Sequence, residues 1–213
     1  MADWVTISAL ASAGGTLVLA GVTVASVRSA NRAARVAEQS LLAAQRPLLV
    51  PSRLDDVTQK VGFADDVWLH VEGSAGAALV TDDGFYLAAS IRNIGTGIAL
   101  LHGWHVYPEV RRGTTGHAPV EDFHRLTRDL YVAPGDIGFW QGVSRDPSTD
   151  EYAAVRAAIE ANERLTVDVL YGDFEGGQRV ITRFGLSPLE ETGRYRVGVG
   201  HHWYLDRPEP RER

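Results

Sequence analysis

The pattern of hydrophobic and polar positions divides the chain into two parts that meet near Pro47. Ahead of Pro47, residues 4–27 include no charged side chain, and residues 28–45 include neither glycine nor proline. After it, apolar residues alternate with polar ones, for example over 165–171 and 195–203. Alternation with a period of two is typical of antiparallel strands that bury one face. The pattern therefore predicts a helical first part and a β-rich second part.

The uncharged run is long enough to cross a membrane. Its 24 residues would extend roughly 36 Å as a helix, against a hydrocarbon core of about 30 Å. The segment must be helical there, because lipid offers no partner for backbone amides. A cleaved signal peptide would have a basic start and a shorter apolar stretch, and neither feature is present. We expect residues 1–27 to form a transmembrane anchor that contacts the lipid bilayer through residues 4–27.

The basic residues beside the run predict its orientation. Arg28, Arg32 and Arg35 directly follow it, whereas only Asp3 precedes it. Because positive residues stay on the cytoplasmic side, we expect the N-terminus outside and the rest of the chain in the cytoplasm. Lys60 is the only lysine among 21 basic residues. Such a preference for arginine over lysine is typical of GC-rich bacterial genomes, so the plasma membrane is the expected location.

Residues 28–46 are expected to continue the helix as a juxtamembrane stalk that ends at Pro47, because the residue before proline favours extended geometry. Small or apolar residues recur at alternating spacings of three and four, as in a heptad. One interpretation is a homo-oligomer formed through the stalk. The alternative is that an alanine-rich segment places small residues at almost any spacing. The repeated positions are Ala13, Thr16, Ala20, Thr23, Val27, Ala30, Ala34, Ala37, Leu41 and Ala44.

Residues 47–205 are predicted to form an immunoglobulin-like antiparallel β-sandwich of about eight or nine strands with one inserted helix. Asp83-Gly84, Pro134-Gly135 and Gly176-Gly177 are the expected turns, the last in a hairpin over 165–186. The helix is expected over 148–161, where Ser148 to Glu151 fits a capping box. An apolar stripe follows at Tyr152, Val155, Ala158 and Ile159. Residues 206–213 are expected to be a solvated tail.

Charge and cysteine content exclude several classes of partner and site. The formal charge is −6, and residues 1–46 account for +2, with four arginines against two acidic residues, so the remainder has −8. Nucleic acid is therefore not an expected partner, because the basic surface that binds phosphates is missing. Zero cysteine excludes disulfides and thiolate metal sites.

The candidate chemical groups do not form a recognisable catalytic, cofactor or metal motif. His102 and His105 should face opposite sides of a strand, and His201 is expected to be a hydrogen-bonded core residue. Asp173 and Glu175 enter a tight turn, where acidic residues are commonly solvated or accept from backbone amides. Gly95 and Gly97 lie between two strands and open no helix, so we expect them to allow positive φ and not to bind phosphate.

Two tryptophans are the candidates for a contact surface. Trp68 and Trp140 lie opposite the main apolar face of their strands. The alternative is that the predicted helix or a loop covers them, since aromatic side chains are readily buried. We expect no catalytic residue, no cofactor and no metal.

The interpretation that best fits the sequence is a membrane-tethered, non-catalytic binding module with an unknown protein partner. The alternative is an enzyme or small-ligand-binding domain whose site is assembled from scattered loop residues. A deep pocket lined by two or more of the following residues would favour that alternative: His102, His124, His201, Asp173 and Glu175.

Five stretches together resemble a group of uncharacterised single-pass membrane proteins of high-GC Gram-positive bacteria. These stretches are residues 46–52, 91–100, 131–142, 167–184 and 202–211. The resemblance implies a membrane anchor followed by a β-sandwich. It implies no activity and assigns no functional residue.

Overall fold

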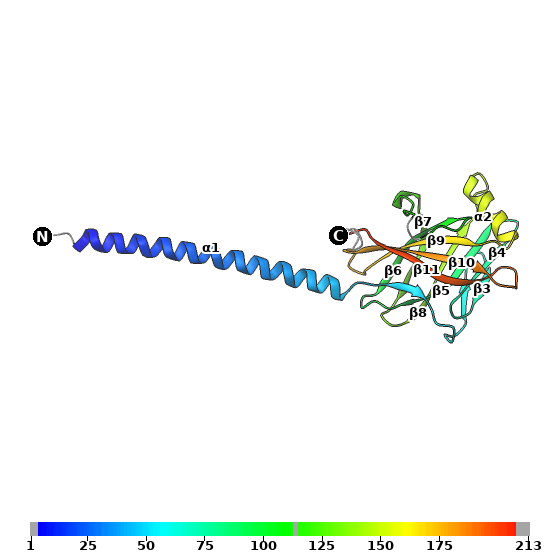
Figure 1. Ribbon diagram of the computed structural model, residues 1–213, viewed down its shortest axis with the longest axis horizontal. Coiled ribbons are helices and arrows are strands. Elements are labelled where there is room, and N and C mark those ends of the chain that lie inside the picture. Colours follow the sequence, from blue (N-terminus) through cyan, green and yellow to red (C-terminus); the bar gives the residue numbers. More distant parts are fainter. Residues whose placement is uncertain (1–3, 113–114, 208–213) are drawn as a thin grey trace. The chain divides into compact units, whose positions relative to one another are not determined.

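The structure, a computed structural model, describes the backbone of residues 4–112 and 115–207 (Figure 1). It describes the side chains of these residues except for 4–13, 16–18 and 43. The chain divides into two compact units, Met1–Ala43 and Ala44–Arg213, and each is described by itself.

A single helix, α1 (Trp4–Ala44), makes up the described part of the first unit. It is continuous through the three glycines of the uncharged run and ends shortly before Pro47. A proline disfavours helical geometry in the residue before it, which accounts for this end. The expected continuation of the helix beyond residue 28 is thereby confirmed as far as Ala44.

No helix in the described part of the chain has both the length and the apolar character that crossing a membrane requires. The predicted span, 4–27, falls partly on residues 4–13 and 16–18, whose side chains lie outside the described residues. Four apolar side chains that are described in this stretch are more than half exposed: Leu19, Val22, Val24 and Val27.

The second unit is mainly β. Nine of its strands form one continuous antiparallel sheet, and β2 and β3 form a separate hairpin. The sheet contains β1 (Leu49–Pro51), β4 (Ala75–Val80), β5 (Phe85–Asn93), β6 (Ala99–Tyr107), β7 (His124–Val132), β8 (Ile137–Ser144), β9 (Leu165–Gly172), β10 (Arg179–Pro188) and β11 (Arg194–Tyr204). The hairpin contains β2 (Gln59–Gly62) and β3 (Trp68–Val71).

The sheet curls, so its inner face surrounds the main core (Figure 1). The strand order is β5-β4-β11-β10-β9-β6-β7, with β1 and β8 both paired to β5. Trp104 of β6 and Trp140 of β8 come from opposite ends of this order, yet their ring centroids are 5.9 Å apart. Bulges in β6 and β11 add the local bend that curling requires.

The immunoglobulin-like sandwich is not confirmed. A sandwich has two separate sheets, whereas here the hydrogen-bonded ladder is unbroken from β5 to β7. The core lies inside one curled sheet and is not enclosed between two layers. The coarser prediction, a mainly β domain of antiparallel strands with one inserted helix, is confirmed.

The inserted helix is α2 (Asp150–Glu160), and its predicted apolar stripe is buried in the main core. The capping prediction needs a correction by one residue. Thr149, not Ser148, is the N-cap, and its hydroxyl accepts a hydrogen bond from the Tyr152 amide at 3.2 Å. The Ser148 hydroxyl donates instead to Asp146 at 2.6 Å.

The predicted turns are confirmed, but the role expected of two glycines was wrong. Gly135 and Gly176 have φ of 79° and 75°, the left-handed region in which a Cβ atom is unfavourable. Gly95 and Gly97 are not among the positive-φ glycines. A Cβ atom at Gly97 would lie 1.7 Å from the Gln45 carbonyl oxygen. These two glycines therefore permit the backbone of residues 45–48 to approach closely.

Two buried tyrosines allow a matched test of hydrogen bonding in this core. The Tyr195 hydroxyl has no partner among the described residues, and burial raises its pKa to about 12. The Tyr171 hydroxyl accepts from the Leu49 amide at 3.1 Å and bonds the Thr182 hydroxyl at 2.8 Å.

Tyr195→Phe should leave the free energy of unfolding unchanged or raise it by up to about 1 kcal/mol, because it removes an unpaired buried polar group. Tyr171→Phe should lower it by about 1–3 kcal/mol, because the Leu49 amide loses its partner. Denaturant titration of the full chain in a non-ionic detergent would measure both. Equal losses in the two variants would contradict this account of the core.

Candidate functional site

The outer face of the sheet is covered over β9 and β10 by the segment that links β6 to β7. We call residues 108–112 and 115–123 the covering segment; it includes the short helix η1 (Val120–Asp122). Every residue of β9 is buried, including those that face away from the main core. Phe123 of the covering segment packs there against Leu170 and Ile181.

A buried ion pair lies beneath the covering segment. Asp168 of β9 and Arg183 of β10 are direct cross-strand partners, with side chains only 0% and 1% exposed. Arg183 Nε lies 2.7 Å from Asp168 Oδ1, and Nη2 lies 2.6 Å from Oδ2. This bidentate geometry is the strongest that an arginine and a carboxylate adopt.

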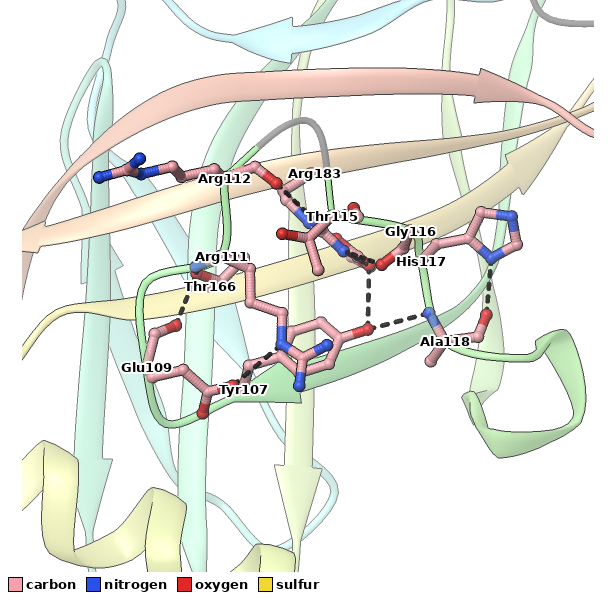
Figure 2. A network of polar contacts seen from close by, with 11 residues as sticks. Tyr107, Glu109, Arg111, Arg112, Thr115, Gly116, His117, Ala118, Thr166 and Arg183 are labelled. Carbon is pink, nitrogen blue, oxygen red and sulfur yellow. Dashed lines mark hydrogen bonds and ion pairs between the residues drawn. The ribbon is translucent and has the colours of Figure 1, made fainter.

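The remaining donors of Arg183 hold the backbone of the covering segment (Figure 2). Its Nη1 donates to the carbonyl oxygens of Arg112 and Thr115 at 3.1 and 2.7 Å, and Nη2 donates to that of Gly116 at 3.2 Å. Arginine has five N–H groups, so all of them are used. Arg183 therefore holds the structure together and has no donor left for a ligand.

Tyr107 connects the same carboxylate to the far end of the segment. Its hydroxyl donates to Asp168 Oδ2 at 3.3 Å and accepts from the Ala118 amide at 2.9 Å. Burial, and after it the charge of Asp168, raises the pKa of Tyr107, so the phenol keeps its proton. The segment is thus held near residue 118 as well as at 112–116.

Thr166 holds the start of the segment. Its hydroxyl donates to the Glu109 carbonyl oxygen at 2.8 Å and accepts from the Arg111 amide at 2.9 Å. The Arg111 guanidinium lies over the Tyr107 ring, 4.0 Å from its centroid (Figure 2). The described backbone around residues 109–118 is therefore fixed by side chains of β6, β9 and β10.

Two hollows adjoin the covering segment. One, of about 480 Å³, we call the histidine hollow; its lining includes His102, Val120, Phe123, Arg125, Asp129 and Arg179. The other, of about 330 Å³, we call the arginine groove; its lining includes Arg111, Arg164, Gly185, Arg196, Gly198 and Val199. Both are basic depressions on a domain whose net charge is negative.

His102 is the titratable group of the histidine hollow. Burial, and after it the charge of Arg179, lowers the pKa of His102, against the opposite effects of Asp129 and Asp173. The imidazole is therefore neutral at pH 7. His105, three residues further along β6, contacts Phe123 at a ring distance of 5.9 Å.

The structure separates the two tryptophans that the sequence proposed as contact residues. Trp68 is 51% exposed, with the Lys60 ammonium 4.5 Å from its ring centroid. Trp140 is 1% exposed and packs edge-on against Trp104. Trp68 thus lies at the surface, whereas Trp140 belongs to the core, because the curl of the sheet turns that face of β8 inward.

The other candidate residues are dispersed. His102 lines the histidine hollow and His124 a different depression beside Trp104. Asp173 and Glu175 border a third depression of about 270 Å³, and the Asp173 carboxylate accepts a hydrogen bond from the Gln178 backbone amide at 3.1 Å. His201 is buried against Trp203, so its expected burial is confirmed. Among the described residues, no group of three or more potential ligands is placed to hold a metal ion.

Sequence reasoning missed Asp168 and Arg183. The sequence signal was incomplete, because Asp168 lies eight residues before Gly176 and Arg183 six residues after Gly177, so a turn centred on the two glycines would not pair them. Arg28, Arg32 and Arg35, the residues used to predict orientation, are exposed on α1.

The chain matches no protein-family model, and it matches no curated protein.

Removing the charge of Asp168 tests the buried pair. Asp168→Asn should lower the free energy of unfolding by about 3–5 kcal/mol, because the Arg183 charge would stay buried without its counter-ion. Glu160→Gln removes one carboxylate from the exposed Arg156–Glu160 pair on α2 and should cost less than about 1 kcal/mol. Denaturant titration measures both variants, and similar costs would show that the buried pair has no special role.

Proposed function

We propose that this protein is a membrane-tethered binding module without a catalytic role, with its β domain in the cytoplasm. The tether is supported by residues 4–27, which include no charge. The exposed side chains of Leu19, Val22, Val24 and Val27 lie within an arc of roughly 200° around α1. An exposed apolar surface that wide on a helical segment without charges is suited to lipid, and Arg28, Arg32 and Arg35 favour the cytoplasmic side beside it.

The observation that supports binding most strongly is the fixed covering segment with a basic hollow on either side. A buried pair and two further side chains hold this surface segment through backbone hydrogen bonds. Burying charge is costly unless every group is paired, and a loop held so firmly presents its exposed residues in one geometry. Pre-organisation of that kind reduces the entropy that binding costs.

A non-catalytic role is supported by the dispersal of the titratable residues. Acid–base catalysis needs groups within hydrogen-bond reach of one reacting atom. His102, His124 and the Asp173–Glu175 pair border three different depressions. A small-ligand-binding role is a second candidate, because both hollows beside the covering segment are within or near the volume range of ligand sites.

The tether predicts how the full chain sediments. It should pellet with membranes and dissolve only on addition of detergent. Gly15→Arg should lower the pelleted fraction, because Gly15 is an exposed residue at the middle of the 4–27 run, where an arginine costs about 2.5–3.5 kcal/mol. Val36→Arg, at an exposed position beyond the span, should leave that fraction unchanged. A wild-type chain that stays in solution after high-speed sedimentation without detergent would overturn the tether.

The binding role predicts a contact at the covering segment in native membranes. A photo-crosslinking residue at Val110, which is 57% exposed, should give a discrete adduct, whereas one at Leu54, which is 72% exposed, should not. Protease added to intact cells should spare the β domain, and permeabilised cells should lose it. Adducts at neither position, or equally at both, would contradict binding at this segment.

A further inference from the structure

Two glycines form the floor of the arginine groove. Gly185 of β10 and Gly198 of β11 are direct cross-strand partners. A Cβ atom at either position would meet no heavy atom within 4 Å. Neither residue has a positive φ, so the backbone itself does not require glycine there. The glycine pair instead leaves a flat, open floor in the middle of a two-stranded ladder.

Apolar side chains flank this floor. Val110 of the covering segment and Val199 of β11 both line the groove, and they are 57% and 46% exposed. A planar or apolar body of a ligand would cover these side chains and the glycine floor. Removal of that area from water favours binding by about 25 cal/mol per Å².

Guanidinium groups make the groove positive. Arg111, Arg164 and Arg196 line it, and no carboxylate occurs among the described residues of its lining. Arg111 forms an ion pair with Glu109 at 2.9 Å. Arg164 and Arg196 form no ion pair within the part of the chain that the structure describes. Two positive charges therefore lack a counter-ion at the edge of an apolar floor.

We propose that the arginine groove binds a phosphate monoester, with the phosphate held by Arg164, Arg196 and Arg111 and the organic part on the Gly185–Gly198 floor. A phosphate monoester has a charge of about −1.5 to −2 at pH 7, which balances the two unpaired arginines, whereas one carboxylate balances only one. Arginine also pairs with phosphate oxygens through two N–H groups at once.

This inference rests on the proposed binding function and names the ligand class. Arg111 is ready for the role, because its backbone amide is fixed by Thr166 and its side chain lies on Tyr107. The histidine hollow suits such a ligand less well. Its lining includes the carboxylate of Asp129, and Arg128 there already donates to the Gly62 carbonyl and to Gln141.

Isothermal titration of the full chain in a non-ionic detergent, with phenyl phosphate as the probe, tests the proposal. We expect a dissociation constant below about 1 mM, with inorganic phosphate and benzoate each at least about tenfold weaker. Inorganic phosphate lacks the apolar part and benzoate lacks the second charge. No heat of binding at about 10 mM phenyl phosphate, or benzoate that binds as tightly, would overturn the proposal.

Three variants locate the site. Arg196→Gln should weaken phenyl phosphate about tenfold or more, and Gly198→Val should abolish its binding by filling the floor without a change in charge. Arg125→Gln, the matched control, removes an equal charge in the histidine hollow and should change the affinity less than about twofold. If Arg125→Gln lowered the affinity for phenyl phosphate as much as Arg196→Gln, the groove would be excluded as the binding site. Wild-type affinity in Gly198→Val would exclude it as well.

Two further experiments distinguish a lipid phosphate from a soluble one, and the phosphate site from the binding module. If phosphatidylinositol 4-phosphate in nanodiscs competes with the probe, the phosphate belongs to a lipid head group; if it does not, to a soluble ester. A Val110 adduct in membranes without any binding of phenyl phosphate would keep the binding module and overturn the phosphate site. Phenyl phosphate binding without an adduct would support the site and contradict a partner at the covering segment.

Discussion

The arrangement of the outer surface depends on the buried pair of Asp168 and Arg183. Removal of two charges from water costs several kcal/mol per ion, and only good geometry and full hydrogen bonding offset that cost. Here the carboxylate accepts from Arg183 and Tyr107, and the guanidinium uses its last three N–H groups on backbone carbonyls of the covering segment. The Asp168–Arg183 pair can therefore be buried only when the covering segment is attached to it.

The same pair explains why β9 is buried on both faces in an antiparallel sheet. Its inner side chains Val167 and Val169 belong to the main core, and its outer side chains lie under the covering segment. Because the sheet curls and brings Trp104 to Trp140, the inner face closes on itself. On the outer face of β10 and β11, the pair of Gly185 and Gly198 stays open beside the covering segment.

Local features of the fold were predictable from the sequence. The helix up to Ala44, the turns at Gly135 and Gly176 and the hairpin over 165–186 depend on residues close in the chain. Exposure of Trp68 also followed from alternation within one strand.

The rest depends on contacts between distant segments. Trp140 is buried because the curl of the sheet brings β8 close to β6. The alternation of residues within one strand does not predict such a contact between distant strands. Gly97 is needed because the backbone at Gln45 passes close to it, not because of its own φ. The hairpin register places Asp168 opposite Arg183, but it does not reveal that a segment some 70 residues earlier than Arg183 supplies the covering carbonyls. The arginine groove was invisible for the same reason.

Native-state hydrogen exchange of the wild-type chain tests most directly whether the pair fixes the covering segment. The amides of Arg111 and Ala118, which donate to Thr166 and Tyr107, should exchange about as slowly as the amides of β9, because both would open only when the buried pair separates. Exchange of these two amides at the rate of an unprotected loop, while β9 stays protected, would contradict the account.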